Sequence, residues 1–290
     1  MSNQISMFDG NKPFKITKPI RLIELFAGIG AQAKALKNIG ADFEHYRICE
    51  YDRFAVQSYN AIHGTNFKPS DITKITAKDL AITDTDKYCY IMTYSFPCQD
   101  LSNAGKGKGM TKGSGTRSGL LWEVERLLRE MEELPQVLLM ENVPPVLKAE
   151  GWADWISFLD GLGYKSRYEV LNAKDFGIPQ NHARVFMVSI LGDYFYTFPQ
   201  KQKLKKRLRD MLEPEPVDKK FYLTDAQIEA TMNSTFTQTA NKIQTGGGDL
   251  QDTVRKRFQR PDLCKTVRPG GRGSIDRHCW DLIEIENERD

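Results

Sequence analysis

Short apolar runs alternate with amphipathic runs through the first two thirds of the chain, and this alternation restricts the fold more than any other feature. Apolar runs that end in turn residues are typical of buried strands; they lie at residues 21–26, 46–50, 88–94, 137–140, 164–171 and 184–190. Runs with a helical spacing of apolar residues lie at 31–39, 53–62, 119–133 (with Ser118 as the expected cap) and 152–162. Strands that alternate with helices predict an α/β fold with a mostly parallel, doubly wound sheet.

Residues with useful side-chain chemistry stand where the predicted strands end. The carboxyl ends of parallel strands meet at one edge of a sheet, which is where such folds bind their ligands. Residues 70–72 are expected to mark a further edge of the sheet. The stretches expected at the ligand-binding edge are Phe26-Ala27-Gly28, Glu50, Asp71, Pro97-Cys98 and Glu141-Asn142. Segments that are far apart in sequence are therefore predicted to form one site.

The turn after the first strand carries a glycine pattern. Gly28, Gly30 and Ala33 match the fingerprint of dinucleotide-binding turns, and Glu50 follows about twenty residues later. Glycine lets a ligand approach the backbone closely, and an acid at this spacing can hold ribose hydroxyls. The pattern predicts a cofactor that contains adenosine, without saying which one.

Three more residues are candidates for contact with the adenine ring of that cofactor. Phe26 and Tyr51 offer flat faces, and Asp71 can accept a hydrogen bond from the exocyclic amine. Ordinary core packing explains Phe26 and Tyr51 equally well when each is considered alone. Their assignment therefore depends on the glycine turn beside them.

Cys98 is the candidate nucleophile. It follows Pro97, which removes a backbone donor and fixes the local φ angle, at the end of an apolar run. Residues 105–118 are rich in glycine, lysine and serine, and the loop over residues 99–117 is expected to be flexible and basic. Most lone cysteines are small buried hydrophobic residues, so Cys98 taken by itself favours that interpretation over a nucleophile.

Several stretches, taken in order, resemble the motifs of the DNA cytosine-5 methyltransferase family. They are residues 24–30 (ELFAGIG), 50–52 (EYD), 71–72 (DI), 96–99 (FPCQ), 117–120 (RSGL), 141–143 (ENV), and 177–180 with 184–186 (GIPQ and RVF). The resemblance extends over roughly residues 20–191. The PCQ and ENV motifs behind FAGIG make it specific.

The resemblance implies both a fold and a division into domains. The fold is a Rossmann-like, S-adenosylmethionine-dependent methyltransferase sheet with a smaller, loop-rich target-recognition domain. The expected catalytic domain covers residues 1–192, and residues 193–290 are expected to be part of a target-recognition domain.

The same resemblance implies a reaction and a set of site residues. Such an enzyme, as found in restriction–modification systems, moves a methyl group from S-adenosyl-L-methionine to carbon 5 of a cytosine flipped out of double-stranded DNA. The expected catalytic residues are Cys98, which would form a covalent adduct, Glu141, Asn142 and Arg184. The expected cofactor-binding residues are Phe26, Ala27, Gly28, Gly30, Glu50, Tyr51, Asp71, Ile72 and Pro97. The expected DNA-binding residues are Gln99, Ser102, Arg117, Gln180 and His182.

Two departures from the family pattern limit this prediction. His182 stands where the family has the middle arginine of its QxRxR motif, and an imidazole carries a full charge only when it is protonated. The last two family motifs, of which the final one completes the cofactor pocket, do not occur before Asp290. We therefore expect either a second polypeptide that supplies them or a shortened chain.

Charge and cysteine content bound the remaining possibilities. Residues 201–280 hold 17 lysines and arginines against 10 aspartates and glutamates, which suits a polyanion, although a solvated basic surface has the same composition. The five cysteines have no metal or disulfide spacing, and the four histidines do not cluster. No apolar run reaches the roughly 18 residues of a membrane span. We expect a cytoplasmic protein that binds no metal and no membrane.

Other functions would also explain part of this sequence pattern. A non-catalytic relative would bind DNA without methylating it, and an RNA cytosine-5 methyltransferase would apply the same chemistry to another acceptor. The basic residues do not separate these hypotheses, because they suit either phosphate backbone. A nucleotide-dependent oxidoreductase would explain the glycine turn, but it gives Cys98 and Glu141 no role.

Overall fold

The computed structural model describes residues 12–101, 109–211, 224, 226 and 264–265. The chain divides into two compact units. The first unit comprises Met1–Leu171 and Ala183–Pro199, and the second comprises Asn172–His182 and Gln200–Asp290. The predicted domain boundary after residue 192 stays a prediction.

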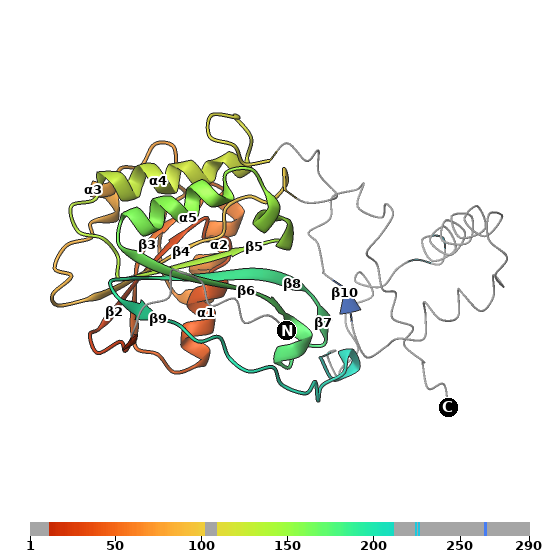
Figure 1. The fold of residues 1–290 in the computed structure, drawn as a ribbon. Coiled ribbons are helices and arrows are strands. Elements are labelled where there is room, and N and C mark those ends of the chain that lie inside the picture. The colour runs from red at the N-terminus through yellow and green to blue at the C-terminus, as the bar shows by residue number, and fades with distance from the viewer. Residues whose placement is uncertain (1–11, 102–108, 212–223, 225, 227–263, 266–290) are drawn as a thin grey trace, which may run out of the picture. The chain divides into compact units, whose positions relative to one another are not determined.

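The first unit is built on a six-stranded sheet with the order β3-β2-β4-β5-β8-β6 (Figure 1). Its strands are β2 (Ile20–Leu25), β3 (Phe43–Cys49), β4 (Cys89–Tyr94), β5 (Val137–Asn142), β6 (Tyr164–Asn172) and β8 (Ala183–Leu191). Strand β2 pairs in parallel with β3 and β4, and β4 pairs in parallel with β5, whereas β8 runs antiparallel to β5. The predicted α/β fold with a mostly parallel sheet is confirmed.

Two short strand pairs accompany this sheet. In the first unit β1 (Lys12–Pro13) pairs in parallel with β9 (Tyr194–Phe195). In the second unit β7 (Gln180–Asn181) pairs in parallel with β10 (Cys264–Lys265). The latter pair joins segments of the second unit that are far apart in the sequence.

The helices cover both faces of the central sheet. They are α1 (Ala31–Asn38), α2 (Arg53–His63), α3 (Ala77–Leu80), α4 (Leu121–Glu130) and α5 (Trp152–Gly161). Short 3-10 helices lie at Ser118–Leu120, Pro144–Lys148, Ala173–Phe176 and Leu208–Met211. Figure 1 shows α4 and α5 on one face of the sheet and α1 on the other. No helix within the described ranges is long and apolar enough to cross a membrane.

Strand β2 shows how the sequence selects these two faces. Side chains alternate across a strand, so Ile23 and Leu25 join the core that includes residues of α4 and α5. Leu22 points the other way and joins a smaller cluster with Ala33 of α1. Glu24 shares the face of Leu22 by the same alternation, and it is completely buried. A buried acid needs hydrogen-bond donors, and Glu24 finds them in the Ala33 N–H and the Tyr59 hydroxyl.

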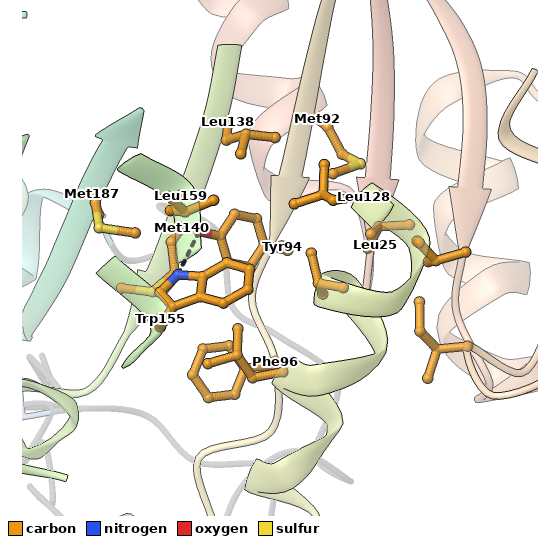
Figure 2. Close-up of a cluster of buried hydrophobic side chains, with 14 of the residues drawn as sticks. Leu25, Met92, Tyr94, Phe96, Leu128, Leu138, Met140, Trp155, Leu159 and Met187 are labelled. Carbon is orange, nitrogen blue, oxygen red and sulfur yellow. Dashed lines mark hydrogen bonds between the residues drawn. The ribbon is translucent and has the colours of Figure 1, made fainter. Parts of the chain in front are cut away.

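The larger core fixes the backbone that leads to Cys98. Figure 2 shows Trp155 of α5 beside Tyr94, and the indole N–H donates to the Tyr94 hydroxyl over 3.2 Å. Phe96, two residues before Cys98, is buried in the same cluster. Truncating a buried aromatic side chain costs about 3–5 kcal/mol, so this packing strongly restrains the chain at residues 94–96.

Two predictions about local structure are wrong. Ser118 does not cap a helix through its side chain; it begins the 3-10 helix before α4, and its hydroxyl donates to the Pro97 carbonyl. Residues 70–72 belong to no strand. Asp71 instead opens a turn in which its carboxylate accepts from the backbone and hydroxyl of Thr73, and such local bonds compete with sheet pairing.

Candidate active site

Four strands end at one edge of the sheet. Leu25 of β2 pairs with Cys49 on one side and with Tyr94 on the other, and Tyr94 pairs with Met140 of β5. The residues that follow these four positions are Phe26, Glu50, Ser95 and Glu141. The topology therefore brings the predicted cofactor turn, the nucleophile segment and the predicted acid to the same edge.

Asn142 ties the nucleophile segment to the end of β5. Its Nδ2 donates to the Phe96 carbonyl over 3.0 Å, and its Oδ1 accepts from the Val143 N–H over 2.8 Å. The Asn142 side chain is almost completely buried. Each end of one side chain thus holds a different segment, and the backbone before Cys98 is fixed next to Glu141.

Ser118 fixes the other side of the nucleophile segment. Its hydroxyl donates to the Pro97 carbonyl over 2.8 Å and accepts from the Asp100 N–H over 3.3 Å, while the Ser118 N–H donates to Asp100 Oδ2 over 3.2 Å. Cys98 lies between these anchors as a free, partly exposed thiol. The chain therefore presents Cys98 at the surface on a backbone that is held at both ends.

Replacing Ser118 by alanine is expected to lower the free energy of unfolding by about 1–3 kcal/mol, because the partly buried Pro97 carbonyl and Asp100 N–H lose their hydrogen-bond partner. Chemical denaturation of the purified protein measures this change. Ser114→Ala is the matched control, since Ser114 is exposed and should change stability by no more than about 0.5 kcal/mol. Equal effects of the two substitutions would show that the Ser118 bonds do not restrain the segment.

Glu141 and Arg184 form an ion pair at the same edge. Arg184 Nε lies 3.0 Å from Glu141 Oε1, and the two side chains are 22% and 25% exposed. Burial raises the pKa of Glu141 above its ordinary value, although the Arg184 charge and a hydrogen bond from Ser95 act in the opposite direction. Ser95 in turn accepts a hydrogen bond of 3.1 Å from Gln32 of α1. Glu141 is therefore a carboxyl group that holds a proton more readily than usual.

The glycine turn and Glu50 form a small cradle. The Gly28 N–H donates to Glu50 Oε2 over 2.8 Å, and the other Glu50 oxygen accepts from the Asp52 N–H over 2.8 Å. Gly28 has a φ of +55°, and a Cβ built on it would meet nothing within 4 Å. Open space beside a turn with an acid bound to it fits an adenosine-containing cofactor, because a ligand can approach this backbone closely.

Gly30 is required for a different reason. Its φ is +79°, and a Cβ there would lie 2.4 Å from His63 Nε2 and 2.6 Å from the Tyr59 ring. Helix α2, which carries both of these side chains, thus packs directly against the turn. The glycine pattern found in the sequence combines one position facing open space with one position facing two rings of α2.

Gly30→Ala is expected to lower the free energy of unfolding by about 2–5 kcal/mol, because backbone strain and overpacking add. Gly40→Ala is the matched control: its φ is +73° but its Cβ would meet nothing within 4 Å, so only the strain of about 1–2 kcal/mol is expected. Denaturant titration of both variants gives the difference. If Gly40→Ala cost as much, the contact of Gly30 with α2 would have no energetic role.

The predicted adenine-binding residues differ in their exposure and in their hydrogen bonds. Ile72 is buried and Phe26 is half-buried, whereas Tyr51 is 78% exposed. The Asp71 carboxylate is already bonded to Thr73, which lowers the pKa of Asp71. Sequence reasoning missed Arg126 of α4, whose guanidinium donates to the carbonyls of Ile72 and Ile75. The charged face of an amphipathic helix gave no indication of this anchoring role.

The predicted DNA-binding residues are only partly described. Gln99 and Arg117 are exposed in the first unit. Ser102 and most of the basic segment from 201 to 280 lie outside the described residues. Gln180 and His182 belong to the second unit, where the His182 N–H donates to Asn172 Oδ1 over 3.0 Å. In the parts of the chain that the structure describes, no three histidine, cysteine or acidic side chains gather as metal ligands.

Comparison with known sequences gives a consistent family match. The profile described as "C-5 cytosine-specific DNA methylase" matches residues 20–276. The orphan methyltransferase M.SssI of Spiroplasma monobiae is 37% identical over 254 residues, which cover 68% of this chain and 65% of that protein. The type II methyltransferase M2.ScrFI of Lactococcus lactis subsp. cremoris is 30% identical over 330 residues, which cover 92% and 89%. The chain thus spans just under two thirds of the length of M.SssI.

Comparison with solved structures supports the fold. The crystal structure of the Schizosaccharomyces pombe Dnmt2 methyltransferase superimposes with a TM-score of 0.58 and 24% identity, covering 71% of this chain and 63% of that one. The Entamoeba histolytica methyltransferase EhMeth superimposes with a TM-score of 0.59 and 17% identity, covering 72% and 64%. At these identities the likeness concerns the fold alone.

Proposed function

The chain belongs to the C-5 cytosine-specific DNA methylase family, and from this premise we propose that it is a DNA cytosine-5 methyltransferase. Its substrates would be S-adenosyl-L-methionine and cytosine in double-stranded DNA. The observation that carries the proposal is the bond from Asn142 to the Phe96 carbonyl, because it holds the Cys98 segment beside the raised-pKa acid Glu141. A nucleophile and a proton donor at one edge of a sheet are the two groups this reaction needs.

Cys98 would act on carbon 6 of the target cytosine. Carbon 5 is a poor nucleophile until a thiolate adds to carbon 6 and makes the ring electron-rich. Methyl transfer to carbon 5 would leave S-adenosylhomocysteine. Loss of the carbon 5 proton to water or another base would then allow the bond to Cys98 to break, which restores the aromatic ring and releases the thiolate. The target base has to leave the duplex to reach the thiol, at a cost on the order of a few kcal/mol.

Glu141 would neutralise the charge that develops on the ring. Its carboxyl group can donate a proton toward N3 and hold the exocyclic amine, which requires the protonated state that burial favours. Arg184, 3.0 Å from Glu141, would hold the base carbonyl or a neighbouring phosphate. Asn142 is a positioning residue in this scheme, since its side chain is occupied by Phe96 and Val143.

The cofactor would be held by the glycine turn and the acids beside it. S-adenosyl-L-methionine supplies a methyl group on a sulfonium, which is reactive toward an electron-rich carbon. We assign the backbone around Ala27 and Gly28 to its approach and Glu50 to its ribose. The remaining residues assigned to the cofactor are Phe26, Gly30, Tyr51, Asp71, Ile72 and Pro97.

Changing Arg184 should move the pH dependence of the reaction. If protonated Glu141 is needed, the single-turnover rate is full below the pKa of Glu141 and falls as pH rises through it. The Arg184 charge favours the ionised form, so Arg184→Gln should raise that pKa further and shift the alkaline limb to higher pH. Arg47→Gln on β3, which is separated from β5 by two strands, should leave the limb in place. A limb that moves to lower pH in Arg184→Gln would contradict the assignment.

The proposed activity is tested by methyl transfer from labelled S-adenosyl-L-methionine. Duplex DNA of mixed sequence, with tRNA as a competing acceptor, should take up label in an amount proportional to protein. Labelling of tRNA in preference to DNA would favour the RNA methyltransferase. Salt-sensitive DNA binding without any transfer would favour the non-catalytic relative.

The finer parts of the prediction are also proposals. We propose that a second polypeptide supplies the two missing motifs. Adding candidate partner chains to the transfer reaction tests this, and a rate that no partner increases would count against it. The DNA-binding roles of Gln99, Ser102, Arg117, Gln180 and His182, and the domain boundary after residue 192, are proposed on the family resemblance. A cytoplasmic location is supported by the free thiols of Cys49, Cys89 and Cys98.

A further inference from the structure

Strand β2 carries a buried acid, Glu24, shortly before the glycine turn, and two groups donate hydrogen bonds to it. Glu24 is 0% exposed. Its Oε1 accepts from the Ala33 N–H at the start of α1 over 3.2 Å, and its Oε2 accepts from the Tyr59 hydroxyl over 2.6 Å. Burial raises the pKa of Glu24, and these two donors oppose the rise. Tyr59 therefore supplies one of two bonds that hold an acid linking β2 to α1.

His63 holds the turn itself. Its Nε2 lies 3.1 Å from the Ile29 carbonyl, and because a carbonyl can only accept, Nε2 carries the proton and donates. Tyr59 and His63 are four residues apart on α2 and share one face of that helix, with ring centroids 4.6 Å apart. Both rings also occupy the space that a side chain on Gly30 would need.

A third side chain fixes the direction of the hydrogen bonds. His45 Nδ1 lies 2.9 Å from the Tyr59 oxygen. The single Tyr59 hydrogen goes to Glu24, so His45 must donate to Tyr59. Burial lowers the pKa of His45, which favours the neutral ring with one proton that this arrangement uses. The network therefore runs from β3 through α2 to β2 and the start of α1.

We propose that Tyr59 and His63 are positioning residues that keep the glycine turn in the conformation that binds the cofactor. His63 holds the Ile29 carbonyl directly, and Tyr59 acts through Glu24 on the first turn of α1. The inference rests on the proposed function for the identity of the ligand. The proposal means that the turn already has its binding conformation in the ligand-free protein. Binding then loses no free energy to a rearrangement of the turn.

Binding of S-adenosylhomocysteine, the demethylated cofactor, tests the proposal by calorimetry with the full chain. Affinity falls in proportion to the fraction of protein with a competent turn, so His63→Leu and Tyr59→Phe should each weaken binding about tenfold. His63→Gln should restore binding to within about twofold of the natural protein, since an amide nitrogen can still donate to Ile29. Tyr164→Phe is the matched control, because its buried hydroxyl donates to the Pro135 carbonyl away from the turn.

Tyr59→Phe and Tyr164→Phe should lower the melting temperature similarly, while only Tyr59→Phe weakens binding. If the natural protein binds S-adenosylhomocysteine, equal affinity in both variants would overturn the proposal. Amide hydrogen exchange of residues 27–30 in the ligand-free protein gives a second readout, and it should be faster in His63→Leu and Tyr59→Phe than in Tyr164→Phe. Unchanged exchange would overturn the proposal even if binding changed. Faster exchange in a protein that binds no S-adenosylhomocysteine would support the positioning role and count against the proposed function.

Discussion

Cys98→Ala is expected to reduce methyl transfer by at least about a thousandfold while the protein remains folded, because the other described thiol at the sheet edge, Cys49, is buried and its pKa is raised to about 11. Single-turnover transfer of labelled methyl groups measures the loss. Cys98 is partly exposed, and among the described residues its side chain has no hydrogen bond that would hold the core together, so little change in unfolding free energy is expected. The loss of methyl transfer would then come from the missing nucleophile and not from unfolding.

Cys89→Ala is the matched control for this experiment. Cys89 is a buried thiol at the start of β4, the strand that leads to Cys98, and burial raises its pKa. Its removal should cost some stability but leave the single-turnover rate within about twofold of the natural protein. A Cys98→Ala protein that kept its rate, or a Cys89→Ala protein that lost it, would contradict the assignment of the nucleophile.

Glu141→Gln should lower the single-turnover rate by about 10²–10⁴, the range expected when a general acid is lost. The amide keeps the shape of the side chain but cannot give a proton to the ring. It also leaves the partly buried Arg184 without its carboxylate partner, so a modest loss of stability should accompany the loss of rate.

Glu44→Gln is the matched control for Glu141→Gln. Glu44 also pairs with an arginine, Arg21, at 2.9 Å, but it follows the first residue of β3 and so lies toward the opposite end of the sheet. Its loss should leave the rate unchanged. If Glu141→Gln kept more than about half of the natural rate, proton donation from Glu141 would not be part of the mechanism.

The strands and the edge they form were predictable because the signals are local. The apolar run that contains Ile23 and Leu25 ends in a glycine turn, and this pattern alone indicates a buried strand with a ligand-binding end. The same holds for the run before Cys98 and the run before Glu141. Once the strands are parallel neighbours, their ends have to meet, and no knowledge of side-chain contacts is needed.

The supports of the site were not predictable, because each depends on segments that are distant in sequence. The residues around Ser118 predicted a helix cap, yet its hydroxyl donates to the carbonyl of Pro97, 21 residues earlier. Tyr59 reaches Glu24 across 35 residues. The one available signal was Glu24 itself, since a charged residue inside an apolar strand has to find donors.

A covalent trap shows directly whether Cys98 adds to the target cytosine. A mixed-sequence duplex that carries 5-fluorocytosine is incubated with the full chain and S-adenosyl-L-methionine; fluorine at carbon 5 cannot leave as a proton does, so the thiol adduct should persist. We expect a denaturation-resistant protein–DNA complex whose digested peptide carries the nucleotide on Cys98, and none with Cys98→Ala. Methyl transfer to ordinary cytosine without a trapped complex, or a complex formed through another residue, would contradict the assignment of Cys98 as the nucleophile.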